Sequence, residues 1–470
     1  MSPPSRFLLL LLSAALLSSL PPRCPALALA QNTVTHLPGF HGPLPFHMET
    51  GYVGVDDRDD VQLFYYFLPS EGDPAEDPLL LWLTGGPGCS AFSGLAFEIG
   101  PIAFLKVRYD GNLPTLVLNP YSWTKIANII FLDSPVGTGF SSRNPEGYKV
   151  GDMSSSKQVE TFIRKWLVDH PQFISNPFYL AGDSYAGKVV PIIAHLISAG
   201  IRVGHKPLVN LKGYLIGNAI TGESVDTSSN IPFVHGMGII SDELYEMTMK
   251  YCGGQDYEYP TTTECAENLF VVDNFISEIK SNHILEPKCL DFVIPMGNRG
   301  IRCRKSLQLY TGGKLIMPPV PDVDCREYSY YLIYLWANND LVRNALHVRK
   351  GTVNEWQRCN WDLDYTCEIE SSVVYQFNLT SSGYRALVYS GDHDAGIPFL
   401  GTQAWIRSLN FPVVDDWHSW SVDGQVAGYT RSYSNNLTFA TVKGAGHTAP
   451  EYKPKECLAM LQRWISHSPL

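Results

Sequence analysis

Three side chains in this sequence are of the types that together turn a hydroxyl group into a nucleophile: Ser184, Asp394 and His447. A serine hydroxyl is weakly nucleophilic at neutral pH, so it needs a histidine to take its proton and a carboxylate to orient that histidine. The residues follow one another as serine, acid and histidine, one of the chain orders in which such triads occur. We therefore predict a catalytic triad for covalent attack on an acyl carbonyl group.

Ser184 stands between a predicted strand and a predicted helix. Residues 177–181 form a short apolar run, typical of a buried strand, and residues 188–199 carry apolar side chains at helical spacing. Gly182 and Gly187 flank the serine and allow a sharp turn. A strand that enters a helix through such a turn is the context of a nucleophile elbow, which holds the serine hydroxyl out at the end of the strand.

The acid and the histidine also follow predicted strands. Residues 385–390 and 437–442 have strand-like patterns, and Asp394 and His447 come shortly after them. Open α/β sheets gather their active sites at the carboxyl ends of the strands. The alternation of strands and helices therefore predicts an α/β fold with a mostly parallel central sheet.

Asp392 is a rival for the role of the acid. Asp394 is preferred because it begins an Asp-x-x-x-Pro pattern that ends at Pro398, as the acid of the α/β-hydrolase fold usually does. His393 is then expected to be a loop or pocket residue rather than the base. Together with the elbow, this placement predicts the α/β-hydrolase fold.

A glycine-rich loop, residues 84–90, follows an apolar strand-like run at 79–83. A tetrahedral intermediate needs N–H donors for its oxyanion, and glycine lets a backbone N–H approach the reacting carbonyl closely. We expect one donor to be the N–H of Tyr185, the residue after the nucleophile, and the other to be that of Gly86. The loop lacks the Gly-Lys-Ser/Thr ending of a phosphate-binding loop.

Four motifs together resemble the serine carboxypeptidase family. They are Leu-Thr-Gly-Gly-Pro-Gly-Cys-Ser at 83–90, Gly-Asp-Ser-Tyr-Ala-Gly at 182–187, Tyr-Ser-Gly-Asp-His-Asp at 389–394 and Gly-Ala-Gly-His-Thr-Ala-Pro at 444–450. The resemblance extends from about residue 51 to the C-terminus. It implies an enzyme that works through an acyl-serine.

The carboxypeptidases of that family hold the terminal carboxylate of a peptide with a hydrogen-bonded set of side chains. The set includes an asparagine before the paired glycines and a glutamate before the serine, where this chain has Thr84 and Asp183. Glu98, a third member of the set, is retained. Thr84 and Asp183 resemble the plant serine carboxypeptidase-like acyltransferases, which move an acyl group from a 1-O-β-glucose ester to an alcohol or amine. The resemblance implies a donor pocket lined by Thr84, Gly85, Asp183 and Glu98.

Two other functions stay open at this point. One is a serine carboxypeptidase, in which Thr84 and Asp183 would still bind a terminal carboxylate. The other, from a different class, is a non-catalytic secretory glycoprotein on a hydrolase scaffold. The partners expected for the favoured reading are a glucose ester and a small acceptor molecule. A net charge of -11 without a concentrated basic patch argues against nucleic acid.

The N-terminus has the pattern of a signal peptide. Arg6 precedes an apolar stretch at 7–20, and a small-x-small site at 28–30 predicts that residues 1–30 are removed. No other apolar run has the length of a membrane span. The secretory pathway is therefore expected, with the vacuolar lumen, implied by the resemblance, or the extracellular space as its end. In an acidic lumen, His447 would need a pKa below the ordinary value of about 6.5 to act as a base.

The cysteines suit an oxidising route. The resemblance implies the disulfides Cys89–Cys359, Cys252–Cys265 and Cys289–Cys325. The pairing of Cys303, Cys367 and Cys457 stays open. No Cys-x-x-Cys spacing occurs, so a structural zinc site is not expected. No metal ion or other cofactor is expected for the predicted chemistry. Asn378 and Asn436 each begin an Asn-Leu-Thr sequence and are predicted glycosylation sites.

The chain is longer than a single hydrophobic core usually supports. Residues 31–220 and 350–470 are predicted to be the two parts of the hydrolase core, and residues 221–349 an inserted, mainly helical cap. Within the cap, residues 297–315 are basic and poor in apolar side chains. They are expected to be an exposed excursion, either cut after folding or left intact. Residues 415–420 are expected to be a surface loop.

Overall fold

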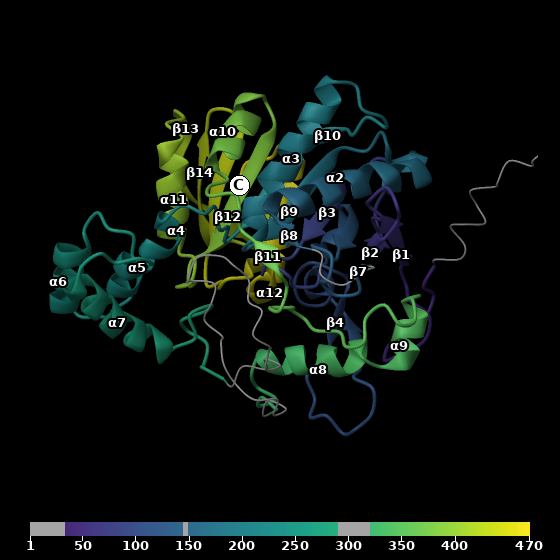
Figure 1. Cartoon of the computed structure of the whole chain (residues 1–470), viewed down its shortest axis with the longest axis horizontal. Helices are drawn as coiled ribbons and strands as arrows, with labels where there is room; N and C mark the ends of the chain where they lie inside the picture. The colour runs from purple at the N-terminus through teal and green to yellow at the C-terminus, as the bar shows by residue number, and fades with distance from the viewer. Residues whose placement is uncertain (1–32, 144–148, 290–319) are drawn as a thin grey trace, which may run out of the picture.

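The computed structural model describes residues 33–143, 149–289 and 320–470 (Figure 1). The predicted signal peptide and the predicted excursion at 297–315 lie outside those residues.

An 11-stranded mixed sheet forms the centre of the molecule. Its middle strands are parallel to one another, in the order β6 (Asn128–Leu132), β3 (Leu79–Leu83), β9 (Phe178–Asp183), β10 (Leu211–Gly217), β12 (Arg385–Gly391) and β15 (Leu437–Val442). Antiparallel strands extend both edges: β2 (Val61–Leu68), β1 (Glu49–Gly54) and β7 (Ser142–Arg143) at one, β14 (Gln425–Tyr433) and β13 (Val413–Val422) at the other. The predicted mostly parallel central sheet is confirmed.

Helices cover both faces of this sheet. In β3, Leu79 and Leu81 pack into one core and Leu80 and Trp82 into the other, as the alternation of a strand requires. Burial on both faces is why the central strands are continuous apolar runs. The first core contains side chains of α2 (Asp152–Asp169), α3 (Ala186–Arg202), α10 (Val373–Ser381) and α11 (Phe399–Ser408), and the second those of α8 (Glu327–Ala337), α9 (Asp340–Ala345), α12 (Ala449–Tyr452) and α13 (Pro454–Ile465).

The segment predicted as a cap lies in two environments. Its first part contains α4 (Val225–Ser228), α5 (Asn230–Gly236), α6 (Asp242–Cys252) and α7 (Thr263–Ser277). The last three of these helices share a small separate core around a disulfide, and Figure 1 shows α6 and α7 beside the sheet rather than on it. The second part, α8 and α9, packs instead into the second of the two cores of the sheet, the one that also contains α12 and α13.

Residues 415–420 are not the surface loop that was expected. They belong to β13, which pairs with β14 in an antiparallel hairpin. Most of β13 is exposed, so its sequence lacks the apolar alternation that marks a half-buried strand. The remaining short elements are β4 (Ile102–Phe104), β5 (Leu116–Leu118), β8 (Val150–Gly151), β11 (Tyr365–Thr366), η1 (Gly94–Glu98), η2 (Trp123–Lys125) and η3 (Pro171–Phe173).

Gly187 lies where the first turn of α3 meets the chain after β10. A Cβ at this position would come 2.3 Å from the Cβ of Ala219, so Gly187→Ala should lower the free energy of unfolding by about 1–3 kcal/mol in urea denaturation. At Gly236 in α5 an added Cβ meets nothing within 4 Å, and Gly236→Ala should leave stability unchanged or slightly raised. Equal losses in both variants would contradict this packing argument.

Candidate active site

Ser184 occupies the turn between β9 and α3. Its φ of 54° lies in the left-handed region, which is costly for a residue with a side chain and typical of a nucleophile elbow. The N–H of Ser184 donates to the carbonyl oxygen of Gly217 at 2.9 Å, which ties the turn to the end of β10. The turn also needs the glycine before it, because a Cβ at Gly182 would come 2.6 Å from the Cβ of Ala186.

The structure brings the three predicted triad side chains together. Nε2 of His447 lies 2.9 Å from Oγ of Ser184, and Nδ1 of His447 lies 2.7 Å from Oδ2 of Asp394. The Asp394 side chain is fully buried, and its other oxygen accepts the N–H of Gly396 at 2.9 Å. With Nδ1 donating to the carboxylate, a neutral ring presents the lone pair of Nε2 to the serine hydroxyl.

Asp392, the rival carboxylate, bonds to groups other than the His447 imidazole. Its Oδ1 accepts the N–H of Gly444 at 2.7 Å and lies 2.5 Å from Nδ1 of His393. Asp392 therefore braces the loop that carries His447, whereas Asp394 orients the imidazole.

Asn218 is a member of this site that sequence reasoning missed. Its side-chain nitrogen donates to Oδ2 of Asp394 at 2.9 Å, and its side-chain oxygen accepts the N–H of Gly391 at 3.0 Å. Asn218 follows β10, which lies between the serine strand and the acid strand. An asparagine directly after the strand that succeeds the elbow helix is the sequence signal that could have indicated it.

The glycine-rich loop lies directly against the elbow. A Cβ at Gly85 would come 2.6 Å from the Cβ of Ser184 and 2.8 Å from the nitrogen of Tyr185, so a glycine is needed there. The N–H of Gly85 donates to Oδ1 of Asp183 at 3.2 Å. Gly86 follows with a φ of 120°, which other residues rarely adopt. The two predicted oxyanion donors, Gly86 and Tyr185, thus belong to two turns in contact.

The carboxyl groups of Asp183 and Glu98 are both buried and interact electrostatically. Burial raises the pKa of Asp183 to about 6, although the nearby His447 and the N–H of Gly85 oppose the rise. Burial and the charges of Asp183 and Glu451 raise the pKa of Glu98 well above its usual range. Oε2 of Glu98 has no hydrogen-bond partner among the described residues. The predicted donor pocket therefore holds two buried carboxyl groups whose pKa values are both raised.

The pKa of His447 is shifted upward. Burial alone would lower it, but the carboxylate of Asp394 and the charge of Asp183 raise the pKa of His447 above its ordinary value. The downward shift that an acidic lumen would require is therefore not found. Because only the neutral imidazole accepts a proton, the fraction of competent base increases as the pH rises through this pKa.

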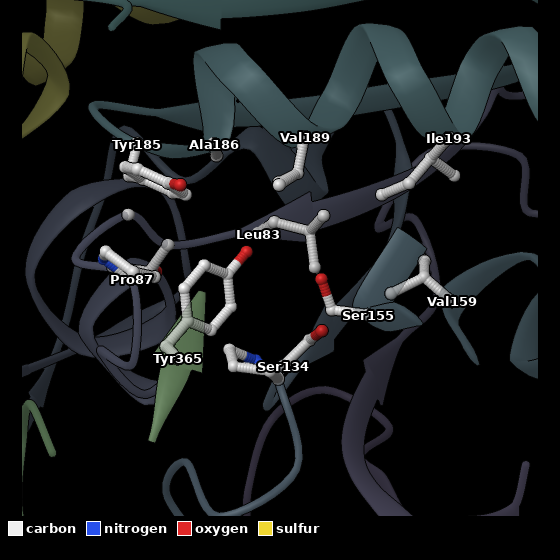
Figure 2. A pocket seen from close by; sticks show the side chains of 13 residues that line it. Leu83, Pro87, Ser134, Ser155, Val159, Tyr185, Ala186, Val189, Ile193 and Tyr365 are labelled. Atoms are coloured by element: carbon white, nitrogen blue, oxygen red, sulfur yellow. The ribbon is translucent and has the colours of Figure 1, made fainter. Parts of the chain in front are cut away.

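A cavity of about 20 Å³ lies next to the elbow and the glycine-rich loop. Figure 2 shows the side chains of Tyr185, Tyr365 and Ser134 around it. The two tyrosine hydroxyls are held by donation to Oδ1 of Asp152, at 2.6 and 2.8 Å. The cavity has room for about one water molecule and none for an aromatic acyl group.

The disulfides implied by the family resemblance are present: Cys89–Cys359, Cys252–Cys265 and Cys289–Cys325. Cys367 is also disulfide-bonded, and Cys457 is a buried free thiol. Cys303 lies outside the described residues. The first bridge joins the glycine-rich loop to the segment before β11, and a hydrogen bond from the N–H of Asn360 to the carbonyl of Gly88, at 2.8 Å, accompanies it.

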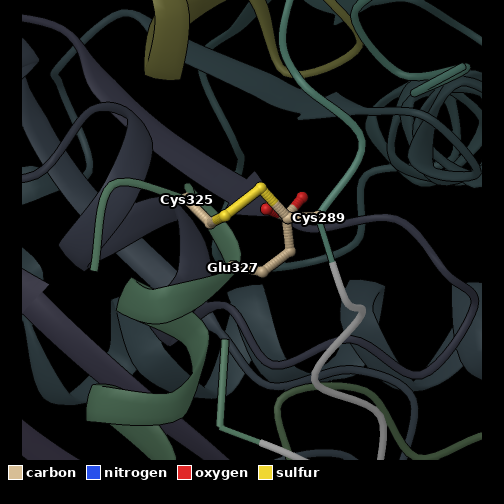
Figure 3. A group of neighbouring side chains, drawn as sticks. All are labelled: Cys289, Cys325 and Glu327. Atoms are coloured by element: carbon tan, nitrogen blue, oxygen red, sulfur yellow. A yellow bond between two sulfur atoms is a disulfide. The ribbon is translucent and has the colours of Figure 1, made fainter. Parts of the chain in front are cut away.

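Cys289, Cys325 and Glu327 lie within reach of a common ion (Figure 3). The two sulfur atoms are bonded to each other, as the figure shows, so they are not available as thiolate ligands. The Glu327 carboxylate is paired with Lys280 at 2.8 Å. The group is thus a disulfide beside an ion pair rather than a set of metal ligands.

The predicted glycosylation sites are both exposed, Asn378 on α10 and Asn436 just before β15. In the part of the chain that the structure describes, none of the helices combines the length and the apolar character that a membrane span needs.

The sequence pattern of the family described as serine carboxypeptidase matches residues 38–467. The chain belongs to the serine carboxypeptidase family. Two similar relatives, serine carboxypeptidase-like 10 and serine carboxypeptidase-like 9 of Arabidopsis thaliana, are 51% and 48% identical over 93% of this chain and 94% of each relative. A solved structure of a prohormone-processing carboxypeptidase from Saccharomyces cerevisiae is similar with a TM-score of 0.72, at 22% identity, over 93% of this chain and 96% of that one. Membership in this family confirms the predicted α/β-hydrolase fold.

We expect the rate at which a fluorophosphonate labels Ser184 to rise with pH as His447 loses its proton. In Asp183→Asn the midpoint of this rise should move to lower pH, because the charge of Asp183 no longer raises the pKa of His447. Asp416→Asn, which changes an exposed carboxylate on β13, should leave the midpoint in place. A midpoint that stays or moves upward in Asp183→Asn would contradict this account.

Removal of the Asn218 side chain should slow the same labelling reaction. Asn218→Ala leaves Asp394 without one of its donors, and we expect a loss of about tenfold through poorer orientation of the imidazole. Asn218→Asp has the same shape but cannot donate when ionised, so it should lose at least as much. Full labelling rates in both variants, compared at equal folded fraction by circular dichroism, would remove Asn218 from the site.

Proposed function

We propose that this protein is an acyltransferase that moves an acyl group from a 1-O-β-glucose ester to an alcohol or amine through an acyl-serine. The observation that carries the covalent step is the 2.9 Å contact between Nε2 of His447 and Oγ of Ser184, continued to Asp394. The choice of donor rests on Thr84 and Asp183, which resemble the acyltransferases rather than the peptidases of the family.

In the first half-reaction, Oγ of Ser184 attacks the acyl carbonyl carbon while Nε2 of His447 takes its proton. The negative charge on the carbonyl oxygen is met by the N–H groups of Gly86 and Tyr185. The bond to the glucose oxygen then breaks, and His447 returns the proton to that oxygen. Glucose leaves, and the acyl group stays on Ser184.

In the second half-reaction, the acceptor hydroxyl or amine gives its proton to His447 and attacks the acyl carbon. The bond to Ser184 breaks, and His447 returns the proton to the serine. Water would give hydrolysis by the same steps. Transfer therefore depends on an acceptor that is oriented at the acyl carbon and on the exclusion of water.

Contacts around the pocket support recognition of hydroxyl groups. Oγ1 of Thr84 accepts the indole N–H of Trp82 at 3.2 Å, so its own hydrogen is left to donate to a ligand oxygen. Burial raises the pKa of Glu98, which favours the protonated carboxyl group, and that form both donates and accepts. Sugar hydroxyls, which also do both, match this set.

The first test is mass spectrometry of the purified protein mixed with a panel of aromatic glucose esters and, separately, with blocked dipeptides. We expect the mass of one acyl group on the peptide that contains Ser184, from a glucose ester only, and no added mass in Ser184→Ala. Turnover of peptides without acylation by any ester would contradict the proposal. Reaction with neither substrate, together with no fluorophosphonate labelling, would favour the non-catalytic alternative.

A serine carboxypeptidase is the second candidate, and the raised pKa values of Asp183 and Glu98 favour it. Protonated carboxyl groups could donate hydrogen bonds to the terminal carboxylate of a peptide. Such binding would weaken as the pH rises through about 6, where Asp183 ionises. A neutral glucose ester has no carboxylate that an ionised Asp183 would repel, so the KM for the ester should vary less over the same pH range.

Exchange of the two pocket residues provides a matched comparison. We expect Thr84→Asn combined with Asp183→Glu to raise the KM for the glucose ester about tenfold or more, because the polar partners of the sugar are displaced. The same variant should gain measurable release of C-terminal residues from blocked dipeptides. Unchanged kinetics with both substrates would show that these residues do not select the donor.

The disulfides and the family are consistent with the secretory pathway. We propose the vacuolar lumen or the extracellular space as the site of action. The upward shift of the His447 pKa favours the less acidic of the two environments.

A further inference from the structure

A short segment after α7, residues 281–284, lies against both loops that carry the acid and the histidine. The carbonyl of Ser281 accepts the N–H of Ala395, and the carbonyl of Asn282 accepts the N–H of His447, both at 2.8 Å. The N–H of Ile284 donates to the carbonyl of His393 at 3.1 Å. The backbone of this segment thus bonds to the neighbours of Asp394 and to His447 itself.

Residues 281–284 pack closely against the loop that carries His447. A Cβ at Gly446 would come 2.2 Å from the carbonyl oxygen of Asn282 and 2.8 Å from the Cβ of His283. The residue before His447 therefore has to be a glycine. The same close packing fixes the position of the His447 loop relative to residues 281–284.

His283 adds a side-chain link. It is buried, and its Nδ1 accepts the N–H of Leu285 at 3.3 Å. The hydrogen of the neutral ring is therefore on Nε2, which lies 3.3 Å from the carbonyl oxygen of Gly444 and donates to it. The ring packs against two others, with centroids 5.7 Å from His393 and 4.7 Å from Tyr452.

The groups around His283 are consistent with a neutral ring. Burial and the nearby His393 lower the pKa of His283, while the hydrogen bond to the carbonyl of Gly444 and the charge of Glu286 oppose them. The ring of Tyr452 packs against it from α12, and His393 is hydrogen-bonded to Asp392. A second proton would have to enter at Nδ1, where it would displace the N–H of Leu285.

We propose that residues 281–284 form a bracket from the cap that holds the Asp394 and His447 loops in register, with His283 as a positioning residue for the triad. The bracket acts on the geometry of the triad, so the inference rests on the covalent chemistry of the proposed function and not on the identity of the acyl donor. Through this bracket the cap influences the reactivity of Ser184.

Two variants of similar size separate the cross-link from local packing. In His283→Gln the amide nitrogen can reach the place of Nε2 and donate to Gly444. In His283→Asn the shorter amide reaches only the place of Nδ1, so it keeps the contact with Leu285 and loses the link to the loop. Both variants lose the imidazole ring, so their thermal midpoints should fall by similar amounts.

The experiment measures the rate at which a fluorophosphonate labels Ser184 in the full-length protein, a reaction in which Oγ bonds to phosphorus, fluoride leaves and His447 takes the proton. We expect a loss of about tenfold in His283→Asn and a loss of twofold or less in His283→Gln. His235→Asn, which changes a half-buried histidine on α5 that is hydrogen-bonded to Asp242, should label at the wild-type rate.

Equal rates in His283→Asn and His283→Gln, whether both high or both low, would overturn the positioning role, because the two differ in the link to Gly444. A wild-type protein that is not labelled at all would overturn the triad and with it the proposed function. A wild-type protein that is labelled, but is not acylated by any glucose ester, leaves the bracket testable by the same variants and contradicts only the choice of donor.

Discussion

The parallel pairing of β9, β10, β12 and β15 is the constraint on which the site depends. Parallel neighbours end at the same edge of a sheet, so the residues that follow these strands come together although they are far apart in the chain. Ser184, Asn218, Asp394 and His447 each follow one of the four strands. The apolar cores on both faces hold the strands in place.

Burial of carboxyl groups governs the electrostatics of this edge. Asp394 is fully buried, but it accepts hydrogen bonds from His447, Asn218 and the N–H of Gly396, which offset the cost of its charge. Oε2 of Glu98 has no hydrogen-bond partner among the described residues, and burial raises the pKa of this carboxyl group. The charges of Asp394 and Asp183 raise the pKa of His447. A site that combines a hydrogen-bonded carboxylate with a buried carboxyl group of raised pKa can orient a base and recognise a polar ligand at the same time.

The predicted cap contains parts with different packing. α5, α6 and α7 share a core of their own, whereas α8 and α9 complete the core on one face of the sheet. Between them, the Cys289–Cys325 disulfide and the ion pairs of Arg326 with Glu286 and Glu451 join the segment after α7 to α8 and to the helix that follows His447. These connections hold the bracket at residues 281–284 beside the loops of Asp394 and His447, so a change in the cap has a direct route to the His447 side chain.

Local pattern was enough to predict much of this protein. Apolar runs of strand length, glycine-flanked turns and the order of Ser184, Asp394 and His447 indicated the strands, the elbow and the triad, because each of these signals depends on residues near in the chain. Residues 415–420 were misjudged since an exposed edge strand carries no apolar alternation. The tertiary structure alone decided what depends on distant residues: the choice of Asn218 as a partner of Asp394, the contact of residues 281–284 with both loops, and the direction of the His447 pKa shift. Burial and the distances between groups from different strands set these features, and neither is encoded in the spacing of residues along the chain.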